Sequence, residues 1–97
     1  MDRLVAIEKC KSEIAQLPEA LGWRDSVLAQ LEFCSAVVLG QAAPDQLEHL
    51  TMGLISVREM DGWPGDAPSL LRQIQYDLQQ EHLPYAAKVR LGIHRRT

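Results

Sequence analysis

Cysteines, aromatic residues and long apolar runs are scarce in this chain, and each scarcity narrows what the protein can be. The only cysteines, Cys10 and Cys34, each fall on the apolar stripe of an expected helix. We therefore interpret them as small buried hydrophobic residues rather than as a disulfide or a metal pair. Aromatic residues make up 5% of the chain, and the basic segment 88–97 lacks the interleaved rings on which single-stranded nucleic acids stack. No apolar run approaches the length of a membrane span. We expect neither a nucleic-acid partner nor a membrane partner.

Motifs for catalysis, metal binding and nucleotide binding are also missing. The histidines have no glutamate or second histidine at metal-ligand spacing, and neither HExxH nor CxxC occurs. The glycines lack the GxGxxG or Walker spacing that wraps backbone N–H groups around a phosphate. No serine stands in a nucleophile elbow. We therefore expect a binding protein that is not an enzyme and that uses no cofactor or metal.

Charge is distributed unevenly along the chain, which the formal net charge of −3 conceals. Residues 1–83 carry all thirteen acidic residues against six basic ones, a balance of −7. Residues 84–97 carry four basic residues and no acid. Either these charges only solvate the surface, or the acidic body attracts a basic partner and speeds the encounter with it. The N-terminal segment is interrupted by charges where a signal peptide needs an apolar region, so we expect a cytoplasmic protein.

Helical periodicity covers nearly the whole sequence and predicts one all-α domain over residues 1–97. Apolar residues recur at spacings of three and four over about 2–17, 27–38, 44–60 and 66–78. Connections of a few residues favour antiparallel neighbours. We therefore expect a small four-helix bundle, followed by an irregular basic C-terminal tail.

Several residues have expected structural roles within this bundle. Gly40 should end the second helix in a left-handed conformation, and Asp66 should cap the start of the fourth. Gly53 inside the third helix costs about 1 kcal/mol relative to alanine, which we explain by close helix packing. The expected shared core contains Leu31, Leu50, Leu54 and Leu71.

The segment "REMDGWPGD", residues 58–66, has the most unusual composition in the chain. Glu59 and Asp61 lie beside the negative end of a helix dipole, where carboxylates are mildly unfavourable. Local stability does not explain them, whereas a binding surface does. The turn residues Pro64 and Gly65 should hold the segment rigid. Two interpretations of Trp63 stay open: it enters a cleft on a partner, or it folds back onto its own bundle.

The string "LTMGLISVREMD", residues 50–61, followed by an acidic connector and "APSLLRQI", resembles a family of small all-helical immunity proteins of bacterial type VI secretion. The family string is Leu-x-Leu-Gly-x-Ile-x-Val-basic-Glu-x-Asp, and Met52 stands at its second leucine. The strong resemblance covers residues 50–74, and the rest of the chain agrees more loosely. The best-known members of this family neutralise NAD(P)+-glycohydrolase effectors.

The resemblance implies a cytoplasmic inhibitor that binds a cognate toxin domain and blocks its active-site cleft. It implies that Glu59, Asp61 and Asp66 are acidic contacts, that Arg58 takes the basic position, and that Trp63 is an aromatic anchor. The connector "GWPG" departs from the plainer acidic connector of the family, so the chemistry of the toxin stays open. The alternative function is a non-catalytic helical adaptor or a dimeric structural protein, with a homodimer forming when the chain is free.

Overall fold

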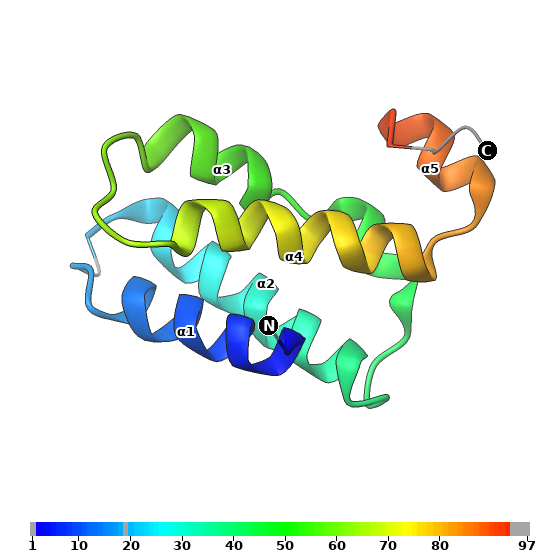
Figure 1. Cartoon of the computed structure of the whole chain (residues 1–97), viewed down its shortest axis with the longest axis horizontal. Coiled ribbons are helices and arrows are strands. Elements are labelled where there is room, and N and C mark those ends of the chain that lie inside the picture. The colour runs from blue at the N-terminus through cyan, green and yellow to red at the C-terminus, as the bar shows by residue number, and fades with distance from the viewer. Residues whose placement is uncertain (1, 19, 94–97) are drawn as a thin grey trace.

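The computed structural model describes residues 2–18 and 20–93, and this part of the chain is helical without any strand (Figure 1). The elements are α1 (Arg3–Ala15), α2 (Gly22–Val38), the 3₁₀-helix η1 (Pro44–His49), α3 (Met52–Glu59), α4 (Ala67–His82) and α5 (Tyr85–Leu91). The predicted all-α class is therefore confirmed. The predicted four-helix bundle is not, because the third expected helix is divided and a fifth α-helix follows the fourth.

Helix α4 lies at the centre of the arrangement, in contact with α1 on one side and α3 on the other, and α2 runs obliquely behind α4 and contacts α1 and α3 (Figure 1). The helices start and stop where local chemistry favours it. The Asp2 side chain caps α1 by accepting a hydrogen bond from the Leu4 N–H at 2.7 Å. After α2, Gly40 adopts a φ of 74°, as predicted. Every element except α5 contributes to the largest fully buried side chains, which are Ile7, Ile14, Leu31, Leu47, Met52, Leu71 and Leu78.

The helix expected over residues 44–60 is broken at Leu50, which is extended with φ −64° and ψ 134°. Two glutamines from other helices supply hydrogen bonds at the break. From α2, Gln30 Oε1 accepts from the backbone N–H groups of Thr51 and Met52, each at 2.8 Å. From α4, Gln79 Nε2 donates to the carbonyl of Leu47 at 2.8 Å. These partners replace the bonds that a continuous helix would make with itself, so the chain can turn here without leaving buried polar groups unpaired.

Restarting the helix at Met52 changes which residues of this segment face the core. Leu31, Leu50 and Leu71 are buried as predicted, but the prediction for Leu54 is wrong: its side chain is 56% exposed. Helix α3 instead buries Met52, Gly53 and Ser56.

Gly53 stands in the first turn of α3, and not in a helix interior as expected. Its N–H donates to Gln75 Oε1 of α4 at 2.9 Å. A Cβ on this residue would lie 3.1 Å from the same oxygen. The close packing predicted at Gly53 is therefore observed, and its partner is a polar side chain.

The C-terminal tail is not irregular over the described residues, because it forms α5. After the extended Leu83 and Pro84, this helix runs to Gly92, whose φ of 71° ends it. Ala87 is buried, and Arg90 forms an ion pair with Glu48 of η1 at 2.9 Å. Helix α5 is thereby fastened to the body at the end remote from the α3–α4 connection (Figure 1). Residues 94–97 of the expected basic tail lie outside the described residues.

Both cysteines are buried free thiols, in agreement with their interpretation as hydrophobic packing residues. Burial raises the pKa of Cys10 and of Cys34 to about 12. Because the thiolate is the reactive form, neither side chain is a nucleophile at neutral pH.

Candidate functional site

The acidic loop, defined here as residues 58–66, connects α3 to α4 at one end of the bundle (Figure 1). Met60 at its base is buried, and its carbonyl accepts a hydrogen bond from the N–H of Trp63 at 3.1 Å. This bond closes a turn in which Gly62 has a φ of 77°. The tight turn therefore lies at Asp61 and Gly62, three positions before the Pro64–Gly65 pair at which the sequence predicted it.

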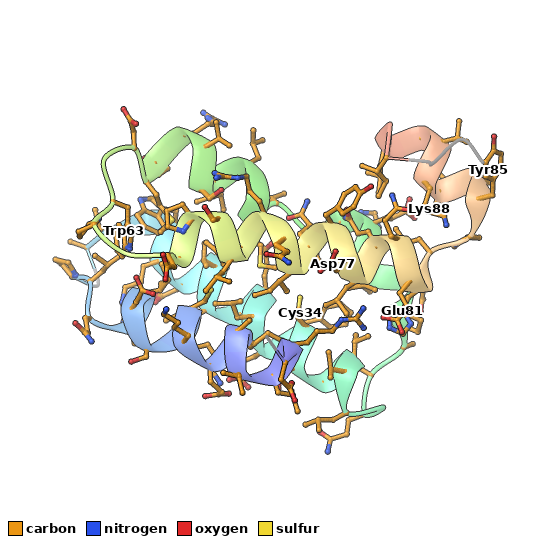
Figure 2. All side chains as sticks on the ribbon, viewed as in Figure 1. Cys34, Trp63, Asp77, Glu81, Tyr85 and Lys88 are labelled. Carbon is orange, nitrogen blue, oxygen red and sulfur yellow. The ribbon has the colours of Figure 1, made fainter. Side chains whose placement is uncertain are left out.

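Trp63 lies against its own bundle, as the second interpretation of this residue predicts (Figure 2). Its ring is partly buried against the core, and its indole N–H donates to Glu13 Oε1 of α1 at 3.0 Å. Gly65 leaves room for this contact, because a Cβ there would collide with the Glu13 carboxylate. Whether the outer edge of the ring also touches a partner stays a prediction.

Sequence reasoning did not identify Glu13 as part of the site. The residue lies one position before buried Ile14 and three after Cys10, beside the apolar stripe of α1. A carboxylate beside such a stripe is the signal that could have drawn attention to it. Its Oε2 atom is buried and has no hydrogen-bond partner among the described residues. The carboxylate thus depends on the indole N–H for its one side-chain hydrogen bond.

A second contact fastens the same loop to α1. Asp66 occupies the N-cap position of α4, as predicted, but its side chain makes no cap hydrogen bond. It accepts instead from Lys9 Nζ at 2.9 Å. The hydrogen bond and the charge of Lys9 hold the pKa of Asp66 below its usual value, and Asp66 in turn raises the pKa of Lys9. Since both side chains are exposed, the pair orients the loop more than it stabilises the fold.

The other three predicted contact residues form no ion pair with α1 among the described residues. Arg58 and Glu59 end α3, Asp61 follows in the turn, and all three are exposed. Within the described residues, neither Glu59 nor Asp61 takes part in an ion pair or a side-chain hydrogen bond. The loop therefore offers two carboxylates that the chain itself does not use.

An open hollow of about 390 Å³ lies beside the loop, between the end of α3 and the start of α4. Asp61, Trp63 and Arg72 are among its lining residues, together with Ser56 at its inner side. The Ser56 hydroxyl donates to the Gly53 carbonyl at 2.6 Å and accepts from Arg72 Nη1 at 3.3 Å. These contacts fix the orientation of the Ser56 hydroxyl and join it to the Arg72 guanidinium of α4.

Two further observations concern the described residues as a whole. Three or more histidine, cysteine, aspartate or glutamate side chains nowhere gather there in a way that could hold a metal ion. Among the same residues, no helix has both the length and the apolar character needed to cross a bilayer.

Comparison of the chain with family models, with curated proteins and with solved structures gives no match.

Proposed function

We propose that this protein is a non-catalytic immunity protein, which binds a cognate bacterial toxin domain and inhibits it by occluding its active site. The observation that carries the proposal is the pair Glu59 and Asp61, exposed on a loop and without ion pairs among the described residues. Their place beside the C-terminal end of α3 is electrostatically poor for the helix. A basic surface on a partner would supply the compensation that the chain does not.

The contacts beneath the loop support the same function. The Trp63 indole and the Asp66 carboxylate join the loop to Glu13 and Lys9 of α1. A loop held by its own body in this way loses little conformational entropy when it docks. In the proposed complex, Trp63 contributes the outer part of its ring to the interface, while its indole N–H continues to position the loop.

The acidic loop would act by imitating the charge of a substrate. Enzymes that consume nucleotides hold anionic groups with basic side chains, and carboxylates form strong charge-assisted hydrogen bonds with such groups. Glu59 and Asp61 would take this place in the toxin, with Arg58 and Asp66 at the rim of the contact. The resemblance of residues 50–74 to the immunity family, and not the loop itself, makes an NAD(P)+ glycohydrolase or another nucleotide-targeting enzyme the toxin that this proposal names.

Co-expression with a candidate toxin domain taken from a neighbouring gene, followed by a pull-down and a growth-protection assay, tests this proposal. The double variant Glu59→Gln, Asp61→Asn should weaken binding by at least about 2 kcal/mol, roughly thirtyfold, if these are interface hot spots. The charge control is Asp45→Asn with Glu8→Gln, which removes the same charge from two exposed positions outside the loop and also loses the exposed Lys11–Glu8 pair. Unchanged protection by the loop variant would show that the loop is not the interface.

The absence of turnover is tested separately with the purified protein. Incubated with NAD+, ATP and common nucleotides, it should leave all of them intact. Reproducible consumption that disappears in the Glu59→Gln, Asp61→Asn variant would overturn the binding-only proposal.

A second candidate function, a helical adaptor, is favoured by one observation. Leu54 and Val57 on α3 are 56% and 60% exposed, which leaves part of this helix apolar toward solvent. An adaptor would bind through this apolar surface and would show no effect of the loop variant in the assays above.

A further inference from the structure

Arg72 of α4 is a cation without a carboxylate partner, and it lines the hollow of about 390 Å³ beside the acidic loop. We call this space the loop-side hollow. Arg72 is exposed, and among the described residues its one hydrogen bond or ion pair is the bond from Nη1 to Ser56 Oγ at 3.3 Å. A guanidinium carries several N–H donors in a planar fork, so most of them remain available. The basic residues of the described chain that do pair with a carboxylate are Arg3, Lys9, Lys11, Arg24 and Arg90.

A buried hydroxyl holds the Arg72 guanidinium at the edge of this hollow. Ser56 is 2% exposed, and it donates its own proton to the Gly53 carbonyl at 2.6 Å. The hydroxyl oxygen is therefore free to accept from Arg72. Because it is held in this way, Arg72 loses less side-chain freedom on binding than an untethered surface arginine does. The first turn of α4 contributes Pro68 and Ser69 to the same hollow, and the positive end of the helix dipole adds to the charge of Arg72.

Asp61 lines the loop-side hollow as well, but it forms no ion pair with Arg72. A protein surface that pairs with Asp61 also covers this hollow, so it withdraws water from Arg72 at the same time. A partner surface with basic groups alone would bring like charge against Arg72 and leave it covered without a partner, and both effects oppose binding. A carboxylate opposite Arg72 removes both effects, because the planar fork of a guanidinium pairs with the two oxygens of a carboxylate.

Building on the proposed function, we propose that the toxin places a carboxylate side chain in the loop-side hollow, where it pairs with Arg72. The basic groups of the toxin pair with Glu59 and Asp61 beside it, so the contact contains both signs of charge on each side. Arg72 thereby determines specificity: it admits a toxin that carries an acid next to its basic groups, and it rejects one that carries basic groups alone.

Calorimetric titration of the full chain with the toxin domain tests the role of Arg72. Arg72→Met should weaken binding by about tenfold or more, while the urea midpoint of the free protein should show that the fold is kept. Arg72→Lys keeps the charge but not the fork, so it should recover only part of the affinity. The charge control is Lys88→Met, which removes the same charge from α5, across the molecule from Trp63 (Figure 2), together with a 3.3 Å hydrogen bond to the Gln80 carbonyl. This control should bind like the parent protein.

Charge reversal identifies the partner carboxylate. Arg72→Glu should abolish binding to the parent toxin, and replacing one aspartate or glutamate of the toxin by arginine should restore it, because the pair is then re-formed with its signs exchanged. A change in the shape of the hollow alone would not be rescued in this way. The outcome against the inference is a toxin that still binds Arg72→Met as it binds the parent protein, or a reversal that no single toxin substitution rescues. If Glu59→Gln with Asp61→Asn weakens binding in the same titrations, the proposed function stands and only the role of Arg72 is refuted. A parent protein that binds no toxin refutes both.

Discussion

The contact between Trp63 and Glu13 should determine how firmly the acidic loop is held, and the variant Trp63→Phe isolates it. Phenylalanine keeps an aromatic ring against the core but removes the indole N–H that donates to Glu13 Oε1 at 3.0 Å. Because Oε2 of the same carboxylate is already without a partner among the described residues, the variant leaves the whole group without a side-chain hydrogen bond.

The size of the effect follows from the chemistry and the partial burial of the pair. A hydrogen bond to a charged group contributes about 1.5–3 kcal/mol. Trp63 and Glu13 are both partly exposed, so water can replace some of the lost bond. We therefore expect the free energy of unfolding to fall by about 1–2 kcal/mol in Trp63→Phe. Glu13→Gln keeps an oxygen that accepts from the indole, and it should cost less.

Urea denaturation gives the stability change, and tryptophan fluorescence reports on the contact itself. Since Trp23 also emits, the fluorescence is measured in a Trp23→Phe background, in which Glu13→Ala should shift the Trp63 emission to longer wavelength. Glu59→Gln is the matched control, because its exposed carboxylate makes no contact with the indole and its loss should change stability by less than about 0.5 kcal/mol. If Glu13→Ala and Trp63→Phe unfold at the parent midpoint and the emission does not move, the loop is not held by this contact.

Three further predictions concern the body of the protein. Gln30→Ala removes the acceptor of two backbone N–H groups at the start of α3, and urea midpoints should show a loss of about 2–3 kcal/mol; a loss below about 0.5 kcal/mol would contradict the capping role. Leu31→Ala should lower the free energy of unfolding by about 2–5 kcal/mol because of the cavity it leaves. Leu54→Ala changes a side chain that is 56% exposed, so it should lower the free energy of unfolding by less than about 1 kcal/mol. Equal losses in the two variants would refute the outward orientation of Leu54. Because the folded-state pKa of Asp66 is lowered, its pairing with Lys9 stabilises the protein fully at pH values above the unfolded-state pKa, and this stabilisation is lost as the pH falls through the folded-state pKa. An NMR titration should show a higher Asp66 pKa in Lys9→Met than in the parent protein. An unchanged Asp66 pKa would refute the pairing.

The sequence by itself determined the helices whose apolar residues follow a regular period. The stripes that contain Ile14 in α1, Leu31 in α2 and Leu71 in α4 all face the core, because helical periodicity depends on residues three and four positions apart. The end of α2 at Gly40 was also predictable, because the left-handed conformation that ends a helix depends on one residue, and glycine adopts it readily.

The tertiary structure alone decided the features that depend on polar partners far away in the sequence. Leu50 and its neighbours have a helical pattern, but Gln30 and Gln79 reach them from α2 and α4 and make the break favourable. Glu13 reaches Trp63 across 50 positions of the chain. Such hydrogen bonds need particular atoms about 3 Å apart, and that distance is set by the packing of whole helices rather than by any short stretch of residues.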